Sequence, residues 1–529
     1  MEKKDDLNAS LNLLARSAAV VFVGVLLSKI FTYVYRIIIA RQFGPDIYGV
    51  FSLAVNILSI FITLSLLGFE SGLVRFIPLY NSKKKEGNIN YMIKFSSKIV
   101  LFTSLFLAAI LFMLSKTIAI GIFHEPRLVF YLQVFSLLTP FVAFTAYMLS
   151  IINGYEKIGL YSFIENISKN LSNVIWIGIL ILAGAGVSSA PWSYLLGSIS
   201  VLILTYIIFR KNITIPLITK INTETHKKIR KEFLSYSIPL LFFVVANVIM
   251  AWIDSFSIGY FKTALEVGWY NAAIPLALLM NIAPQLFIKL FFPLITREYG
   301  NNKNTIRELS KQVNKWIFFI NIALFMLLFT FPEAFLNLFF GKDYVVAATS
   351  LRILSIGMLA ISMLRISDRL IAMIGNSKAL LFNILIAAAA NFILNTIFIP
   401  MPYVFGIENA SGINGAALAT TISNILLGVL SFAQARKYTS VIPFRRKMLN
   451  FFGASLVSII LIWPFRSAIN SSSLWLITLS VSFIYLYLIF SWLFKGLDKN
   501  DLFVMRSFTS KIKSKKESHA EIISSKEDI

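Results

Sequence analysis

Long apolar runs alternate with short polar stretches along the chain. Each run covers roughly twenty residues or more, enough for a helix rising ~1.5 Å per residue to cross a hydrocarbon core about 30 Å thick. The runs are too long and too evenly apolar for the strands of a membrane barrel, which alternate in polarity and need only about ten residues. The pattern predicts an all-α integral membrane protein with about fourteen transmembrane helices, at 13–39, 47–69, 95–115, 128–151, 158–184, 190–209, 234–260, 268–292, 315–340, 346–374, 379–400, 411–435, 448–468 and 473–494.

Composition agrees with this pattern. Of the 529 residues, 57% are hydrophobic and only 14% are charged, yet the formal net charge is +24. Lysine and arginine collect in the loops between apolar runs, so the positive charge indicates membrane topology rather than nucleic-acid binding. The chain has no cysteine, which excludes disulfides and thiol catalysis. The three histidines His124, His226 and His519 lie far apart, and we expect neither a metal site nor a cofactor.

The side of the membrane follows from the loop charges. If the N-terminus lies inside, the alternate loops that become cytoplasmic hold most of the lysines and arginines, and the outer loops hold few. This asymmetry is the one that positive-inside sorting produces, and a miscounted span would destroy it. We therefore predict a multi-pass protein of the cell membrane with both termini in the cytoplasm.

An internal repeat divides the chain. Gly49 and Gly268 follow the first and seventh predicted spans at an offset of 219 residues, and Lys157 and Lys378 lie 221 apart. An offset of six spans preserves orientation, so we expect two parallel six-helix lobes related by a pseudo-two-fold axis along the membrane normal. The predicted parts are a cytoplasmic N-terminus (1–12), an N-lobe (13–210), a basic linker (211–233), a C-lobe (234–437), spans thirteen and fourteen (438–495) and a cytoplasmic polar tail (496–529).

Ionisable residues inside the predicted spans are the candidate site residues. Each costs about 2.5–3.5 kcal/mol at a helix centre, so each needs a partner, a polar path or access to the interface. Lys29 and Arg36 share one face of span one, and Arg365 and Arg369 share one face of span ten. Asp254 in span seven has no local partner, and we expect it to pair with Lys29 or Arg36 or to bind a coupling cation.

The alternatives for these residues are structural. Arg36 can reach the outer surface beside Arg41, and Lys29 can pair with a carboxylate inside the bundle. The span-ten arginines can form an internal ion pair with Asp368. Glu165 and Lys169 lie four residues apart and are expected to satisfy each other. Glu70, like Lys289, is expected to act as an interfacial anchor.

The candidate residues are mostly cations, which favours an anionic solute. An unpaired phosphate cannot cross hydrocarbon, and arginine binds phosphate through two parallel hydrogen bonds. No nucleotide-binding or catalytic motif is present, and the loops are too short for a soluble catalytic domain, so we predict a transporter and not an enzyme.

The opening of the chain resembles a known family. The resemblance is carried by residues 36–45 (RIIIARQFGP), followed by Tyr48-Gly49 and by Leu67-Gly68-Phe69 leading to Arg75. These segments are similar to the start of the oligosaccharide and polysaccharide (Wzx-type) flippases of the MOP exporter superfamily. That family is related to the lipid II flippase and the MATE exporters. The segment 267–273 (VGWYNAA) also resembles that family, and the likeness covers roughly residues 10–495.

The resemblance implies a function and a site. It implies that a polyprenyl-(pyro)phosphate-linked oligosaccharide moves from the cytoplasmic to the outer leaflet by alternating access, through a cavity between two lobes. It gives Lys29 and Arg36 a place in that cavity, with Asp254, Arg365 and Arg369 as further substrate-binding candidates. The expected partners are this lipid-linked glycan, membrane lipids and a coupling ion, for a protein that works as a monomer.

Two rival functions remain open. A cation-coupled, MATE-like exporter of small amphipathic molecules would require acidic cavity residues, and the cationic bias argues against it. A membrane glycan polymerase or ligase would require a large outer loop with catalytic residues.

Overall fold

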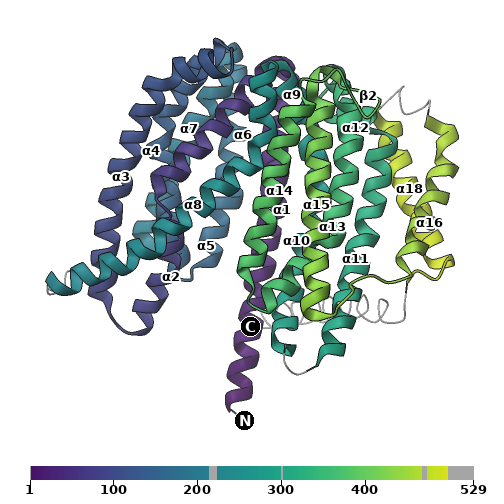
Figure 1. Cartoon of the computed structure of the whole chain (residues 1–529). Helices are drawn as coiled ribbons and strands as arrows, with labels where there is room; N and C mark the ends of the chain where they lie inside the picture. The colour runs from purple at the N-terminus through teal and green to yellow at the C-terminus, as the bar shows by residue number, and fades with distance from the viewer. Residues whose placement is uncertain (1, 214–222, 300–301, 467–472, 498–529) are drawn as a thin grey trace, which may run out of the picture. The chain divides into compact units, whose positions relative to one another are not determined.

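The computed structural model describes residues 2–213, 223–299, 302–466 and 473–497, which are almost entirely helical (Figure 1). They form two compact units. Unit 1 is drawn from Met1–Ala277, Phe335–Leu354 and Leu385–Ser423, and unit 2 from Leu278–Ala334, Ser355–Ile384 and Asn424–Ile529.

Unit 1 contains the first nine α-helices, with π-helical and 3₁₀ turns between some of them. These elements are α1 (Glu2–Leu66), α2 (Phe69–Ser82), α3 (Glu86–Lys116), η1 (Thr117–Ile122), α4 (Arg127–Gly154), α5 (Ile158–Ser162), η2 (Phe163–Ser168), α6 (Lys169–Leu182), η3 (Gly186–Ser188), α7 (Ser189–Asn212), α8 (Thr223–Phe261) and most of α9 (Ala264–Leu278). Helix α4 packs against α1, α2, α3 and α7, and α8 packs against α1 and α2.

The core of unit 1 is apolar and its lipid-facing surface is apolar too. Phe69 and Phe233 contact each other in the core with ring centroids 4.9 Å apart. On α3, by contrast, the side chains of Phe102 and Met113 are 70% and 78% exposed. Large apolar side chains on an outer helix face are stable only against lipid, so the α3 face marks this unit as membrane-embedded.

Besides α9, whose last residue falls in unit 2, four helices contribute residues to both units, and the remaining described helices belong to unit 2. The shared helices are α12 (Pro332–Phe339), α13 (Ala348–Met373), α14 (Ser377–Phe398) and α15 (Ile413–Thr439). Unit 2 also contains η4 (Leu279–Asn281), α10 (Ile282–Glu298), α11 (Lys303–Thr330), α16 (Met448–Ile462), η7 (Trp463–Phe465) and α18 (Ser473–Leu493). Its core includes Phe291, Ile317, Ile366 and Ala435.

Unit 1 also takes in the connections around α13 and α15. These include η5 (Lys342–Ala347), η6 (Ala410–Gly412) and a two-residue hairpin that joins β1 (Tyr403–Val404) to β2 (Ile407–Glu408) with Val404 opposite Ile407. Both turn residues, Phe405 and Gly406, have positive φ, which is the conformation that a tight hairpin requires. Asn409 then joins α14 to α15, because its amide donates to the carbonyl of Phe398 (2.6 Å) and its oxygen accepts from the Gly415 amide (2.5 Å).

A sharp break replaces the loop expected between spans one and two. Helix α1 continues through this region except at Gly44, where φ is 78° and ψ is 173°. Only glycine adopts that conformation readily, and Pro45 directly after it suits the first turn of a new helix. Helix α1 therefore consists of two arms, before and after Gly44.

The structure confirms the all-α membrane fold. Within the described residues, twelve helices are long and apolar enough to cross a membrane. The predicted fourteen spans and these twelve helices differ for two reasons. The first two predicted spans are the two arms of α1 and count as one helix, and the fifth predicted span is divided into α5, η2 and α6. The number of crossings, the lobe symmetry and the proposed domain boundaries stay predictions.

Candidate functional site

Arg365 and Arg369 line one cavity in unit 2. The cavity holds about 460 Å³ and lies between α10, the η4 turn before it and α13. The four-residue spacing places both arginines on one face of α13, as the sequence predicted, and both side chains are half-buried. The lining consists of Asn281, Pro284, Gln285, Ile288, Phe292, Arg365 and Arg369. We call it the arginine cavity.

Among the described residues, the arginines of the cavity form no direct ion pair, although the charge of Asp368, between them on α13, acts on both. In the described part of the chain neither arginine forms an ion pair, and the predicted alternative of an ion pair with Asp368 is not observed. The Nε of Arg369 is buried without a hydrogen-bond partner. The amide of Gln285 adds a neutral donor, and the Asn281 amide nitrogen donates to the Met358 sulfur (3.8 Å). This set of donors is suited to an anionic group with several oxygen atoms.

Lys29 and Arg36 lie on the first arm of α1, in unit 1. Lys29 is exposed and Arg36 is half-buried. The neighbouring polar positions of this arm make defined contacts: Thr32 donates to the side-chain oxygen of Asn170 (2.9 Å), and the Tyr33 hydroxyl donates to the Pro275 carbonyl (3.0 Å). These contacts with α6 and α9 fix the rotation of the arm about its axis.

Asp254 on α8 is held by neutral donors. Its carboxylate accepts hydrogen bonds from the Tyr270 hydroxyl (2.8 Å), the Asn395 amide (2.8 Å) and the Thr420 hydroxyl. Asn391 extends the network, because it accepts from Asn395 (3.0 Å) and donates to Thr420 (3.1 Å). We call these five residues the Asp254 cluster.

The partners of Asp254 differ from those that the sequence suggested. Among the described residues it forms no ion pair with Lys29 or Arg36. Tyr270 and Asn395 are completely buried, so the cluster places a carboxylate among polar groups inside the helices of unit 1. Carboxylate, amide and hydroxyl oxygens are the ligands that hard monovalent and divalent cations prefer, and a carboxylate is also a proton acceptor. The arrangement is chemically suited to binding a cation or a proton.

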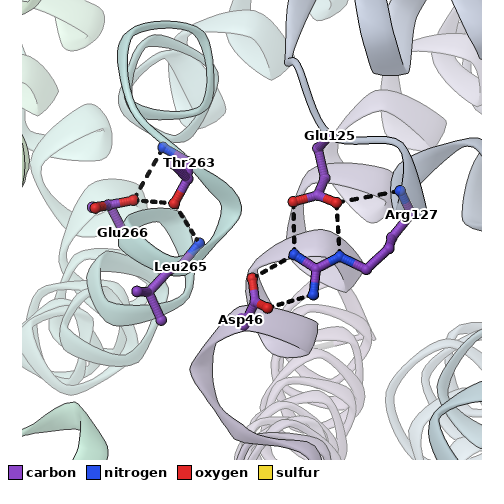
Figure 2. Close-up of polar contacts among 6 residues, drawn as sticks. All are labelled: Asp46, Glu125, Arg127, Thr263, Leu265 and Glu266. Atoms are coloured by element: carbon purple, nitrogen blue, oxygen red, sulfur yellow. Dashed lines mark hydrogen bonds and ion pairs between the residues drawn. The ribbon is translucent and has the colours of Figure 1, made fainter.

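A second charged cluster joins the break in α1 to the start of α4. Figure 2 shows the Arg127 guanidinium between two carboxylates, with Nη2 2.8 Å from both Asp46 and Glu125 and Nε 2.8 Å from Glu125. Beside it, Glu266 accepts from the Thr263 backbone amide (3.0 Å) at the start of α9. The two carboxylates satisfy the arginine on two sides, so this cluster is structural.

Sequence reasoning missed several of these contacts. Arg41 was counted only as an outer-loop charge, but it donates to the carbonyls of Phe339 (2.9 Å), Asn337 (3.1 Å) and Leu338 at the end of α12. A cation at the C-terminus of a helix satisfies carbonyls that have no partner within the helix. Its partners lie almost 300 residues further along the chain, and no local pattern indicates them.

Comparison with known proteins places the chain in a family. The family model described as polysaccharide biosynthesis protein matches residues 14–298, more than half of the chain. The chain belongs to the polysaccharide biosynthesis protein family. This membership confirms the family predicted from the RIIIARQFGP motif. An uncharacterized membrane protein of Methanocaldococcus jannaschii is 21% identical over 413 residues, which cover 75% of this chain and 79% of that protein.

Solved structures confirm the fold of the MOP superfamily. The lipid II flippase MurJ in an inward closed conformation matches with a TM-score of 0.69 and 19% identity, over 89% of this chain and 98% of MurJ. An inward-facing multidrug resistance MATE transporter of the MOP superfamily matches with a TM-score of 0.61 and 17% identity, over 78% of this chain and 94% of that protein. At such identities the likeness shows that this family member shares their architecture.

Proposed function

We propose that this protein is a flippase that moves a polyprenyl-(pyro)phosphate-linked oligosaccharide from the cytoplasmic to the outer leaflet by alternating access. The observation that carries the proposal is the arginine cavity. It places two arginines that form no ion pair in the described residues beside a hollow of about 460 Å³, in a membrane protein of a polysaccharide biosynthesis family. A guanidinium without a direct partner among apolar helices is costly unless a ligand or water binds it.

A diphosphate group suits this cavity better than other cargo. Each guanidinium can hold two phosphate oxygens, and charge-assisted hydrogen bonds are shorter and stronger than neutral ones. The polyprenyl chain needs no binding site of this kind, because it stays in the hydrocarbon of the bilayer. Lys29 and Arg36 would contribute further positive charge to the cargo path of unit 1.

The Asp254 cluster is the proposed coupling site. A cation or proton bound at Asp254 would neutralise a carboxylate that now has only neutral partners. Moving one elementary charge through 100 mV provides about 2.3 kcal/mol, enough to bias a transport cycle. We further propose that the protein works as a monomer in the cell membrane with both termini in the cytoplasm, as the loop charges predict.

Reconstitution tests the proposal. Proteoliposomes containing undecaprenyl-diphosphate-linked or dolichyl-diphosphate-linked oligosaccharide should show leaflet transfer, read out by access of an added glycan-cleaving enzyme. Arg365→Gln with Arg369→Gln should slow transfer at least about a hundredfold, since charge-assisted hydrogen bonds contribute about 1.5–3 kcal/mol each. Arg436→Gln, an exposed arginine in the last turn of α15, is the matched control and should transfer at the wild-type rate.

Two results would contradict the proposal. The first is a folded wild-type protein that transfers none of these lipids. The second is transfer of a cationic dye, inhibited by no lipid-linked glycan, which would favour the MATE-like exporter instead.

A further inference from the structure

Unit 1 contains a second polar cavity that the proposed function does not yet use. It holds about 680 Å³ and is lined by residues of α1, α2, α4, α7 and α8 and by the α5–η2–α6 segment. Its charged lining residues are Glu70, Arg75, Glu165 and Lys169, and its aromatic ones include Tyr194 and Tyr236. We call it the Glu70 cavity. Its volume lies within the range of small-molecule binding sites.

The charges of the Glu70 cavity cancel, unlike those of the arginine cavity. Lys169 forms an ion pair with Glu165 at 3.2 Å. The Arg75 guanidinium lies 4.2 Å from the ring centroid of Tyr236, in a cation–π contact. Two acids therefore accompany two bases. A free phosphate here would meet two carboxylates, so the cavity is unsuited to the diphosphate group.

Glu70 is the group in this cavity that lacks a partner. In the part of the chain that the structure describes, its carboxylate forms neither an ion pair nor a hydrogen bond. Glu70 lies on α2, beyond the span that ends at Leu66, and burial raises its pKa, with the nearby charge of Glu165 adding to the effect. A half-buried carboxylate facing a hollow leaves strong acceptor sites for hydroxyl groups of a ligand.

The backbone near Glu165 is also unusual. Glu165 lies within η2, a single π-helical turn that interrupts the α5–α6 helix directly before Lys169. Single π-helical turns inside α-helices are frequent at functional sites. Here the turn carries the ion pair that forms one wall of the cavity.

We propose that the Glu70 cavity is a subsite for the glycan of the lipid-linked cargo, which binds neutral hexose or N-acetylhexosamine units. Carboxylates of Glu70 and Glu165 accept from sugar hydroxyls, and Lys169 donates to them. The ring of Tyr194 offers an apolar surface for the C–H side of a sugar, with a polar hydroxyl at its edge, and Tyr236 holds Arg75 against its own ring. This inference rests on the proposed function, and it gives the glycan a binding site in unit 1 whose chemistry differs from that of the arginine cavity.

Binding measurements separate the two cavities. The first probe is undecaprenyl diphosphate without sugar. The second is the free oligosaccharide that mild acid releases from the lipid-linked glycans of the membranes in which the protein naturally occurs. Isothermal titration calorimetry on the full chain in nanodiscs gives both affinities. Glu70→Gln with Glu165→Gln should weaken binding of the free oligosaccharide at least about tenfold, or about 1.4 kcal/mol, and change undecaprenyl diphosphate binding less than about twofold. Arg365→Gln with Arg369→Gln should do the reverse.

The controls keep this test decisive. Glu86→Gln removes an exposed carboxylate at the start of α3 and should leave both affinities unchanged. Glutamine preserves side-chain size, and an unchanged gel-filtration profile shows that each variant folds. Wild-type protein that binds undecaprenyl diphosphate but not the free oligosaccharide at millimolar concentration overturns the glycan subsite and leaves the flippase proposal standing. Equal weakening of both probes by the Glu70 and Glu165 substitutions overturns it too. Glycan binding without leaflet transfer of any lipid-linked glycan contradicts only the proposed function.

Discussion

Two glycines allow the second arm of α1 to cross α9 at backbone contact. A Cβ added at Gly49 would lie 1.7 Å from the Ala264 carbonyl oxygen, and one added at Gly268 would lie 1.9 Å from the Pro45 carbonyl oxygen. Contacts between carbon and oxygen normally begin at about 3.3 Å, so alanine at either position forces the backbones apart by more than about 1 Å. The neighbours are backbone atoms, and no side-chain rotation relieves the clash.

The cost can be worked from the contacts that this separation would break. Overpacking by one methyl group typically costs about 1–3 kcal/mol, and the upper end applies where backbone must move. The Tyr48 hydroxyl, on the same arm, donates to the Asn271 carbonyl (3.2 Å) across this contact. Each net hydrogen bond contributes about 0.5–1.5 kcal/mol. We therefore expect Gly49→Ala or Gly268→Ala to destabilise the protein by about 3–5 kcal/mol.

Reversible unfolding in mixed micelles measures the free energy of unfolding of both variants and of the double variant. Once the first methyl group separates α1 from α9, the second costs little, so the double variant should lose much less than the sum of the single losses. Gly178→Ala, on α6, is the control. A Cβ added at Gly178 has nothing within 4 Å, so this variant should be neutral or slightly more stable than wild type. Wild-type stability of either single variant, or strict additivity, would refute the close-contact reasoning.

Three further predictions follow from the charged clusters. Asp254→Asn should abolish transport driven by an ion gradient and spare exchange without a gradient, both measured in the same proteoliposomes. Loss of both activities, or retention of both, argues against a coupling role for Asp254. Arg127→Gln should destabilise by about 1 kcal/mol at low salt and by less at high salt, since its pairs with Asp46 and Glu125 are partly exposed. In acid, Glu70→Gln should have the same unfolding midpoint as wild type, because the Glu70 carboxyl is protonated in both the folded and the unfolded state. As the pH rises through the elevated pKa of Glu70, wild type must bury a charge, and the midpoint of the variant should rise above that of wild type. Parallel stability curves over that range would show that burial at Glu70 carries no penalty.

Sequence patterns predicted the features that depend on local spacing. Helix length and hydropathy predicted membrane-spanning helices, and a four-residue spacing predicted both the Glu165–Lys169 ion pair and a common face for Arg365 and Arg369. Gly49 and Gly268 marked the repeat in the sequence, and the structure places these two glycines in contact, which the repeat did not predict.

Features that depend on distant segments were not predictable. The donors to Asp254 come from α9, α14 and α15, with Asn395 and Thr420 141 and 166 residues away. Glu70 was expected to be an interfacial anchor, but it lines a cavity with residues of α4 and α6 that the chain reaches some hundred residues later. Hydrogen-bond partners of this kind follow from helix packing, which local patterns in a single sequence do not reveal. The assignment of Lys29, Arg36, Asp254, Arg365 and Arg369 to substrate binding stays a prediction.

The break at Gly44 has a mechanical consequence. Because a single residue, and no flexible loop, separates the two arms of α1, a tilt of the arm that carries Lys29 and Arg36 would act directly on the arm that carries Gly49. That second arm rests on α9 at backbone contact, so such a tilt would press on this contact. Inserting flexible residues at the Gly44 break would uncouple the two arms of α1 and leave the contacts of each arm unchanged.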